Sequence, residues 1–256
     1  MSTSELPIGI FDSGVGGVSV LRELVRLMPN ENYIYLGDSK NAPYGTKSHE
    51  EIFLHAESCA GYLIKKGVKA LVVACNTATS VCIDDLRLKY PQIPVIGIEP
   101  ALKPAVMYKE NSTVVVMATP LTLKERKFAR LCRNYSMRSK IIPLHCPGLM
   151  ELVEEGKVYT EETFAFLKAC FKDIEMEKVD AVVLGCTHYP FVKSAIGKLM
   201  PNAKIFDGGE GTARQVRRLL VKQGHVSLSD KKGSIVFENT LNEEKINNLA
   251  RNLLEK

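Results

Sequence analysis

The chain has 256 residues, which is enough for one large domain or two small ones, each with a hydrophobic core. Its 34 basic and 29 acidic residues leave a net charge of +5, too weak to predict nucleic-acid binding and mildly favourable to an acidic substrate. No apolar run approaches the roughly 18 residues that span a bilayer and no secretory signal precedes the first strand, while seven scattered cysteines agree with reduced thiols, so we expect a cytoplasmic protein.

The first predicted strand, residues 7–12, runs into a glycine-rich turn at residues 13–17 and then into an amphipathic helix that Pro29 ends. Asp12 and Ser13 therefore lie at the carboxyl end of a strand, where open α/β sheets bind ligands. The turn does not match the dinucleotide-binding fingerprint, because the third glycine position falls on Ser19. A plain tight turn is the alternative to a functional role here.

A second strand, residues 32–37, is followed by a loop at residues 38–46 that is dense in turn-forming residues. Composition alone does not decide whether this loop has a function. The next helix carries Cys59 on its apolar face, which favours a core position for that thiol, and Gly67 ends the helix.

Two copies of one sequence pattern then stand out, at residues 69–79 and 180–190. In each copy, a charged residue leads into a short apolar run of the buried-strand type, which ends in a cysteine and is followed by small or polar residues that begin a helix. A single cysteine is more often core filler than a functional group. A matched pair, Cys75 and Cys186, instead indicates a joint role, because a helix amino terminus favours anions and lowers a thiol pKa.

Between and beyond the two cysteine patterns, the chain keeps alternating strands with helices. A break at residues 99–104 could mark a domain crossing, and the basic helix predicted at residues 124–140, which Thr122 can cap, is best explained as a solvated face. The other predicted elements are strands at 94–98, 113–118, 140–144, 204–207 and 233–237, and helices through Glu151 to Glu155, at 161–178, after residue 208 and at 242–255. This alternation predicts an α/β fold with two similar domains, each a mostly parallel sheet flanked by helices.

Taken together, these motifs resemble the glutamate racemases of the cofactor-independent aspartate/glutamate racemase superfamily, nearly from end to end. The two cysteine patterns carry the superfamily resemblance, and the Asp-Ser and Pro-Tyr-Gly motifs point to glutamate. The matching stretches are Phe11–Gly17, Gly37–Ser39, Ala42–Gly45, Ala74–Thr77, Ile96–Ala101, Cys146–Pro147, Leu152–Glu154, Leu184–Pro190 and Asp207–Arg214.

The resemblance implies an organisation and a biological setting. It implies a first domain of residues 1–97 and 208–256, a second domain of residues 98–207, and an active site in the cleft between them, with the two cysteines facing each other. It also implies a homodimer, no cofactor and no metal, a cytoplasmic location, and D-glutamate supply for the peptidoglycan of the cell wall. The only partner expected besides a second copy is glutamate, with neither nucleic acid nor membrane.

Racemisation removes the α-proton from one face of an amino acid and delivers another proton to the opposite face, and a thiolate is a base suited to this task near neutral pH. Carried over residue by residue, the resemblance makes Cys75 and Cys186 the two bases, with Asp12 assisting the first and His188 and Glu154 assisting the second. It assigns substrate binding to Asp12, Ser13, Pro43, Tyr44, Gly45, Asn76, Thr77, Thr187 and His188.

Three other interpretations stay open from the sequence. The same chemistry could act on aspartate or a hydantoin. Cys186 and His188 could be the nucleophile and base of a cysteine hydrolase or amidotransferase, which would leave Cys75 unexplained. A metal-binding or redox module built from the cysteines and His188 would lack any regular ligand spacing.

Overall fold

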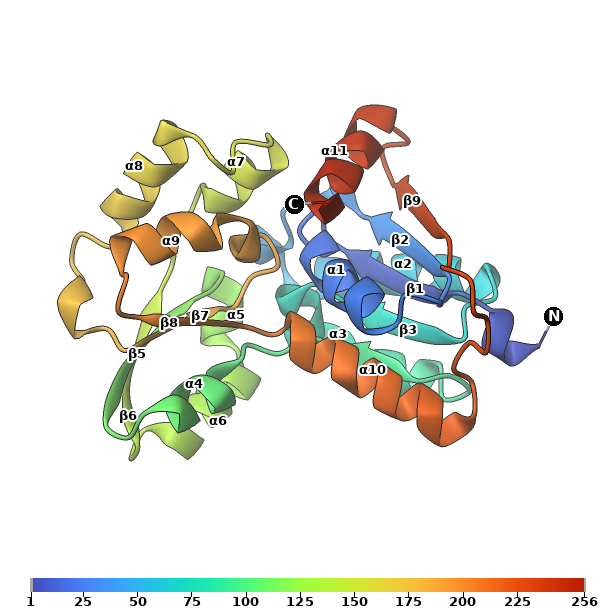
Figure 1. Ribbon diagram of the computed structural model, residues 1–256, viewed down its shortest axis with the longest axis horizontal. Coiled ribbons are helices and arrows are strands. Elements are labelled where there is room, and N and C mark those ends of the chain that lie inside the picture. The colour runs from blue at the N-terminus through green and yellow to red at the C-terminus, as the bar shows by residue number, and fades with distance from the viewer. Residues whose placement is uncertain (1, 256) are drawn as a thin grey trace. The chain divides into compact units, whose positions relative to one another are not determined.

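The structure is a computed structural model that describes residues 2–255, and the chain folds into two compact units. The first unit holds the residues up to Ile98 and those from Gly209 onward, and the second unit is Glu99–Gly208. Each unit contains a parallel sheet with helices on both faces, which confirms the predicted α/β fold (Figure 1). Among the described residues, no helix is both long enough and apolar enough to cross a membrane.

The sheet of the first unit has five strands in the order β4-β3-β1-β2-β9, all parallel to their neighbours. Every residue of β1 and β3 is buried, as expected of central strands that are covered on both faces. The strand bounds are Ile8–Asp12 for β1, Tyr33–Gly37 for β2, Ala70–Val73 for β3, Val95–Gly97 for β4 and Ile235–Asn239 for β9.

Five α-helices cover this sheet. Helix α1 contacts both α10 and α11 on one face, and α2 packs against α3 on the other (Figure 1). Ser48 and Glu51 form a capping box at the start of α2, and Gly67, with a positive φ of 77°, lies just past its end. The bounds are Val18–Leu27 for α1, His49–Lys65 for α2, Asn76–Lys89 for α3, Gly209–Gln223 for α10 and Glu244–Glu255 for α11, with 3₁₀ turns at Thr3–Glu5, Ser39–Asn41 and Tyr44–Thr46.

The sheet of the second unit has four parallel strands in the order β6-β5-β7-β8. Helices α4 and α6 cover one face, where Leu102 and Phe128 join a core with Val114, Val116 and Val183. The other face carries α7, α8 and α9 (Figure 1). The strand bounds are Ser112–Met117 for β5, Ser139–Leu144 for β6, Ala181–Leu184 for β7 and Lys204–Asp207 for β8.

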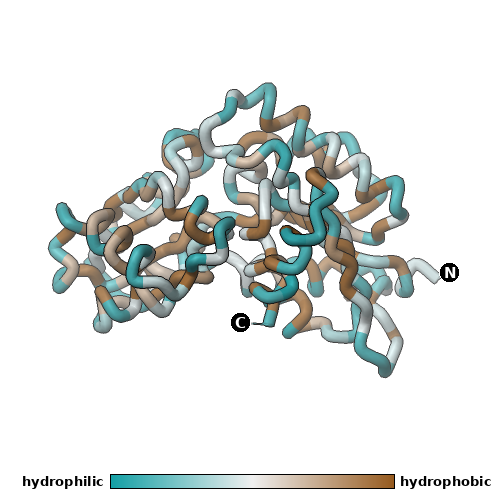
Figure 2. The backbone as a smooth tube through the Cα atoms, turned by 90° about the horizontal axis from the view of Figure 1, so that it is seen from above, coloured by the Kyte–Doolittle hydropathy of each residue, from teal (hydrophilic) through white to brown (hydrophobic). Residues whose placement is uncertain are grey.

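No α-helix described in this unit is longer than ten residues, which is the length of the shortest α-helix of the first unit. Their bounds are Leu102–Tyr108 for α4, Pro120–Lys124 for α5, Arg126–Tyr135 for α6, Leu149–Glu154 for α7, Glu161–Cys170 for α8 and Lys193–Leu199 for α9, with 3₁₀ turns at Met176–Lys178 and Tyr189–Val192. In both units, hydrophobic and hydrophilic residues alternate along the helices, as amphipathic packing against a sheet requires (Figure 2).

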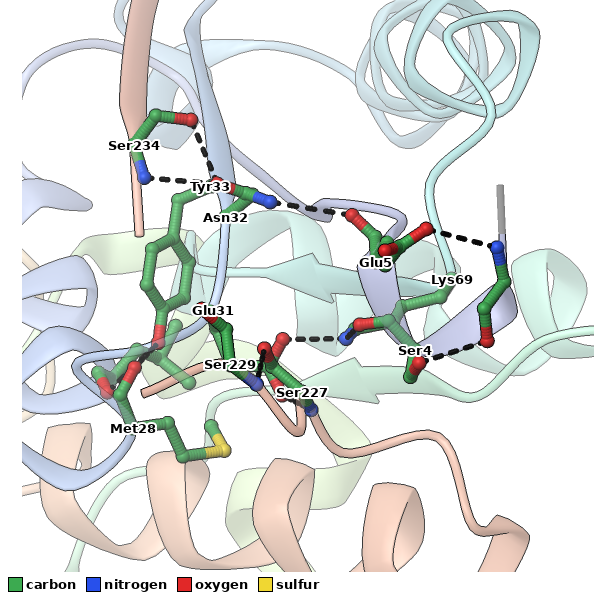
Figure 3. A network of polar contacts seen from close by, with 12 residues as sticks. Ser4, Glu5, Met28, Glu31, Asn32, Tyr33, Lys69, Ser227, Ser229 and Ser234 are labelled. Carbon is green, nitrogen blue, oxygen red and sulfur yellow. Dashed lines mark hydrogen bonds and ion pairs between the residues drawn. The ribbon is translucent and has the colours of Figure 1, made fainter. Parts of the chain in front are cut away.

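A buried ion pair lies in the first unit, just before the amino ends of β2 and β3. Lys69 Nζ donates to Glu31 Oε2 at 2.5 Å and to the backbone oxygen of Ser4 at 2.6 Å, and both charged side chains are almost fully buried (Figure 3). The other carboxylate oxygen of Glu31 accepts the backbone N–H of Ser227 at 2.8 Å. This ion pair therefore connects the N-terminal segment, the residues just before β2 and β3, and the segment between α10 and β9.

Three details of the second unit differ from the sequence predictions. The basic helix ends at Tyr135 instead of residue 140, because Ser139 and Lys140 already pair with β5 as part of β6. Its neighbour α5 is capped by Thr119 and not by Thr122, since Pro120 occupies the first helical turn and Thr119 Oγ1 accepts the N–H of Thr122. Helix α8 ends at Cys170, eight residues before the predicted end at 178.

Candidate active site

A first cluster of predicted site residues lies at the carboxyl ends of β1, β2 and β3, which are neighbours in the sheet of the first unit. Asp12 ends β1 and Ser13 follows it, while Cys75 lies two residues past the end of β3. The parallel register that pairs Phe11 with Val73 brings these positions to the same edge of the sheet. The Cys75 thiol and the Ser13 hydroxyl oxygen are 3.7 Å apart.

Cys75 is the N-cap residue of α3, as the sequence pattern predicts. Its sulfur accepts the backbone N–H of Ala78 at 3.4 Å, and its side chain is nearly buried, with 5% of the residue surface exposed. An N–H donor and the positive end of a helix both favour negative charge on a capping group. The N–H of Ala78 and the helix terminus thus offset part of the cost of burying a charged sulfur at Cys75.

Asp12, the last residue of the neighbouring strand β1, is completely buried, and one of its carboxylate oxygens accepts the N–H of Gly14 at 3.2 Å. Gly17, the N-cap residue of α1, lies against it with an ordinary helical φ of −62°. A Cβ atom added to Gly17 would lie 2.6 Å from the Cβ of Asp12 and 3.0 Å from that of Ala74. Only a glycine fits here, because any side chain would clash with Asp12 and Ala74. The glycine thus lets α1 approach the carboxyl ends of β1 and β3.

The loop after β2, residues 39–46, which we call the substrate loop, holds the predicted residues Pro43, Tyr44 and Gly45. Tyr44 is buried, its ring stacks on that of His55 at 5.9 Å, and its hydroxyl donates to Asp38 Oδ2 at 2.5 Å. Burial, followed by the charges of Cys59, Asp38 and Cys75, raises the pKa of Tyr44 far above its usual range. Tyr44 therefore stays a neutral hydrogen-bond donor near the first thiol.

Asp38 is a residue to which the sequence analysis gave no role, although its motif was noticed. Besides Tyr44, it accepts the Asn41 amide N–H₂ at 2.9 and 3.1 Å and the Thr240 hydroxyl at 2.8 Å. Thr240 is 202 residues away in sequence, so no local pattern could have indicated this contact.

Asn76 and Thr77, the first two residues of α3, are buried beside Cys75. Both polar side-chain atoms of Asn76 are buried and have no hydrogen-bond partner among the described residues. Leaving such an amide unpaired costs about 1–3 kcal/mol, so a position of this kind calls for an explanation such as a ligand. Asn76 is therefore the strongest indication of a binding function in the first cluster.

A second cluster lies in the second unit, at the carboxyl end of β7. His188 Nδ1 is 3.6 Å from the Cys186 sulfur, and His188 Nε2 is 2.7 Å from Glu154 Oε1, at the end of α7. His188 and the adjacent Thr187 are buried. The contacts form a chain from thiol to imidazole to carboxylate.

The charge of His188 depends on this chain. Burial lowers the pKa of His188, but the hydrogen bonds to Cys186 and Glu154 outweigh it and raise the pKa well above the usual 6.5. The imidazole is therefore protonated at neutral pH, and it can stabilise a Cys186 thiolate on one side while bound to the Glu154 carboxylate on the other.

The two cysteine patterns differ in one respect that the sequence analysis got wrong. Cys75 caps an α-helix, whereas Cys186 is followed by a 3₁₀ turn at Tyr189–Val192, and α9 begins only at Lys193. Pro190 lies in the first turn of that 3₁₀ segment. The helix terminus that was expected to favour the second thiolate is absent, and the charged His188 takes its place.

Two further cysteines lie near the second cluster. Cys146, after β6, is buried, and its contact with the Cys170 side chain, together with burial, raises its pKa above the usual range. A raised pKa keeps this thiol protonated and makes it a poor base. Among the described residues, no group of three or more His, Cys, Asp or Glu side chains could hold a metal ion.

Comparisons with known proteins identify the family of the chain. The profile of the family described as Asp/Glu/Hydantoin racemase matches residues 8–216. The chain is 51% identical to the glutamate racemase of Clostridium acetobutylicum, and the alignment covers 100% of both chains. It is also similar to the D-glutamate complex of the Francisella tularensis enzyme, with a TM-score of 0.84, 30% identity and coverage of 99% and 95% of the two chains.

A third similar structure is that of Escherichia coli glutamate racemase in complex with L-glutamate and an activator. The TM-score is 0.85 at 30% identity, and the alignment covers 97% of this chain and 95% of that one. The relatives thus include proteins seen with each enantiomer of glutamate.

Proposed function

The chain belongs to the Asp/Glu/Hydantoin racemase family and is an amino-acid racemase, and we propose that it interconverts L- and D-glutamate by proton transfer between two cysteines. The observation that carries this proposal is that each unit presents one thiol past the carboxyl end of a strand, beside a polar side chain: Cys75 is 3.7 Å from the Ser13 hydroxyl, and Cys186 is 3.6 Å from His188. Two separate acid/base groups are what inversion at a carbon needs.

In the proposed mechanism, one cysteine rests as the thiolate and the other as the thiol, on opposite faces of the bound glutamate. The thiolate takes the α-proton, which leaves a carbanion, and the opposite thiol delivers its own proton to the other face of the same carbon. The product is the mirror-image amino acid, and the thiolate has moved to the other cysteine. The next turnover of the opposite enantiomer restores the first state.

Each thiolate has its own source of stabilisation. For Cys75, the donor is the N–H of Ala78 at the start of α3, and Asp12 can accept a proton or position the ammonium group of the substrate. For Cys186, the donor is the protonated His188, whose charge Glu154 supports. In this proposal, a backbone N–H stabilises the thiolate of Cys75 and a charged imidazole stabilises the thiolate of Cys186.

We propose that the buried polar groups around the first thiol hold the substrate. The unpartnered amide of Asn76 can both donate and accept, which suits an amino acid with two carboxylates and an ammonium. Ser13, Tyr44, Gly45 and Thr77 would add donors from the first unit, and Thr187 with His188 would add donors from the second. Fixed donors of this kind also stabilise the charge that develops on the carbanion.

The proposal extends to a setting that rests on the family resemblance. We propose that the enzyme needs no cofactor, acts in the cytoplasm as a homodimer, and supplies D-glutamate for peptidoglycan synthesis. Depleting the protein should make growth of the producing cell depend on added D-glutamate. Growth that stays independent of D-glutamate after depletion would contradict the proposed pathway.

One experiment tests the chemistry directly. The purified protein is incubated with D- or L-glutamate in heavy water, with a chelator and no added pyridoxal, while NMR follows the α-proton signal and polarimetry follows optical rotation. Both enantiomers should lose the α-proton, and rotation should decay to zero. Equal rates on aspartate would contradict the assignment of glutamate as the substrate.

Single cysteine variants extend that test. Cys75→Ala and Cys186→Ala should each lower the racemisation rate by about 10²–10⁴-fold, because each removes one acid/base group. Cys132→Ala is the matched control, since that half-buried cysteine on α6 belongs to neither cluster. Full racemase activity in Cys75→Ala would refute the two-base mechanism.

The chain from Cys186 through His188 to Glu154 also has the geometry of a nucleophile, its base and an orienting carboxylate, as in cysteine hydrolases. Membership of the racemase family and the separate cluster around Cys75 favour racemisation instead. Glutamine consumption that survives Cys75→Ala and is lost in Cys186→Ala would favour the hydrolase.

A further inference from the structure

The first unit contains a hollow of about 400 Å³ that none of the proposed catalytic residues lines. It lies between the side of α2 and the carboxyl ends of β2 and β9, where β9 is the edge strand of the sheet. A volume of this size is in the range of small-molecule binding sites. We call it the edge pocket.

One stripe of α2 forms a wall of the edge pocket. It consists of His55, Ser58, Cys59 and Tyr62, which recur at the spacing of one helix face. A helix face that serves only to pack on a sheet is apolar, as Ile52, Ala56 and Leu63 of the same helix are. This stripe adds the polar groups of His55, Ser58 and Tyr62 beside the buried Cys59, and it borders the open space.

The other wall brings two carboxylates to the edge pocket from neighbouring strands. Leu36 of β2 is in register with Glu238 of β9, and Asp38 follows two residues beyond Leu36. Glu238 Oε1 pairs with Lys66 at 3.1 Å, whereas its Oε2 atom is buried and has no hydrogen-bond partner among the described residues. No Lys or Arg side chain is among the described residues that line the pocket.

This chemistry selects the class of occupant. The walls offer two carboxylates, four asparagine amides and several hydroxyls around the ring of Phe237, so they accept hydrogen bonds and favour positive charge. An anion such as a phosphate or a second glutamate would meet two carboxylates, one of them paired with Lys66, and no Lys or Arg among the described residues that line the pocket. A small organic cation with several N–H donors fits instead.

The edge pocket and the substrate loop share residues. Asp38 and Asn41 line the pocket, and Asp38 also accepts the Tyr44 hydroxyl. Thr240, on the same wall, donates to Asp38 Oδ1 and accepts the backbone N–H of Lys40 at 3.0 Å. A cation that draws on the Asp38 carboxylate would compete with Tyr44 and Asn41 for its oxygens.

We propose that the edge pocket is a binding site for a small organic cation with N–H donors, and that its occupant weakens glutamate binding by loosening the hold of Asp38 on the substrate loop. The effect on glutamate binding rests on the proposed role of Tyr44 and Gly45 in substrate binding. The cation-binding site itself depends only on the residues that line the pocket.

The probe is agmatine, a linear molecule with a guanidinium at one end and an ammonium at the other, which supplies one cationic group for each of the two carboxylates. Isothermal titration calorimetry of the full-length protein measures binding, with sulfate as the anionic comparison. Glu238→Gln removes one charge from the pocket wall, and Ser58→Phe fills the space. Glu57→Gln is the matched control, because Glu57 lies on α2, pairs with Lys89 and does not line the pocket.

We expect saturable agmatine binding to the wild type and Glu57→Gln, at least fivefold weaker binding to Glu238→Gln and none to Ser58→Phe. Saturating agmatine should raise KM for glutamate at least twofold in the wild type and leave kcat within twofold. Absence of saturable binding, or equal binding to wild type and Glu238→Gln, would overturn the site even if Ser58→Phe fails to fold.

Binding without a change in KM would overturn the coupling to the substrate loop. The calorimetric result does not depend on catalysis, so it is distinguishable from a failure of the proposed function, which would appear as absent glutamate racemisation before any agmatine is added.

Discussion

At the scale of single residues, the two thiols are supported by different means, and His188 is the side chain whose charge matters most. It is fully enclosed, yet two hydrogen-bond partners keep it protonated. Cys75 instead accepts the backbone N–H of Ala78 and lies at the amino terminus of α3. The two directions of racemisation therefore need not respond alike to pH.

The protonation of His188 can be measured by NMR titration of the histidine rings. We expect the His188 signals to titrate well above pH 6.5, and Glu154→Gln to move that pKa downward because it removes one of the two groups that favour the charged ring. His145 is an internal comparison, since burial lowers the pKa of that ring.

The same shift has a consequence for stability. Because the folded pKa of His188 is raised, its contribution to unfolding free energy is complete below about pH 6.5 and is lost as pH rises through the folded value. The stability difference between wild type and Glu154→Gln should therefore shrink at alkaline pH, as urea titrations at several pH values can measure. A His188 that titrates below His145 would contradict the assigned charge.

At the scale of elements, the active-site positions depend on how closely α1 approaches β1 and β3. Gly17→Ala would push a methyl group against Asp12 and Ala74. We expect a loss of about 1–3 kcal/mol in unfolding free energy, typical of overpacking, and at least a tenfold fall in kcat. Urea unfolding and the racemase assay measure the two effects.

Gly211→Ala is the control for that substitution. Gly211 lies in α10, and nothing lies within 4 Å of a Cβ built there. Alanine should leave activity unchanged and stabilise the helix slightly, because glycine loses more backbone freedom on folding. Equal activity of both variants would show that the contact between α1 and Asp12 does not position the carboxylate.

Much of this architecture could be predicted from the sequence. Buried strands such as β1 and β3 are short apolar runs, and the sequence correctly places Asp12 at the end of β1 and Cys75 just past the end of β3. The sequence places the start of the helix after Cys186 incorrectly. The pattern of Thr187 to Pro190 resembles a helix start, but the chain forms a 3₁₀ turn at Tyr189–Val192. Local sequence does not distinguish these two geometries reliably.

Contacts between distant segments were beyond the sequence analysis for a different reason. The bond between Thr240 and Asp38 depends on β9 lying beside β2, which no periodicity reveals. The edge pocket follows from the same pairing, since the edge strand leaves space beside α2. The sequence therefore predicts which side chains lie at the strand ends, but it does not predict the distant residues that hydrogen-bond to them.

At the scale of the whole molecule, the first unit is assembled from two ends of the chain, and the pair of Lys69 and Glu31 joins them. Residues 209 onward return to supply α10, β9 and α11. The Glu31 carboxylate holds the N–H of Ser227 in this returning segment, while Lys69 holds the backbone of Ser4 (Figure 3). The network lies at the amino end of the sheet, away from the first cluster.

Removing one partner of this pair should be costly. Lys69→Met leaves the Glu31 carboxylate buried without its cation, and we expect a loss of about 3–5 kcal/mol in unfolding free energy, measured by urea titration. The double variant Lys69→Met/Glu31→Gln removes both charges, while the glutamine oxygen can still accept the N–H of Ser227. It should regain more than half of the loss. Lys89→Met, which breaks an exposed pair with Glu57, should change stability little.

The kinetics of the same variants separate stability from function. Because the pair lies at the amino end of the sheet of the first unit and the first cluster lies at the carboxyl end of that sheet, the folded fraction of Lys69→Met should keep the kcat of the wild type at a temperature where it is folded. A double variant no more stable than the single one would show that the hydrogen bonds, and not the unpaired charge, dominate the loss. A kcat that falls in a fully folded Lys69→Met protein would show that the two ends of the sheet are coupled.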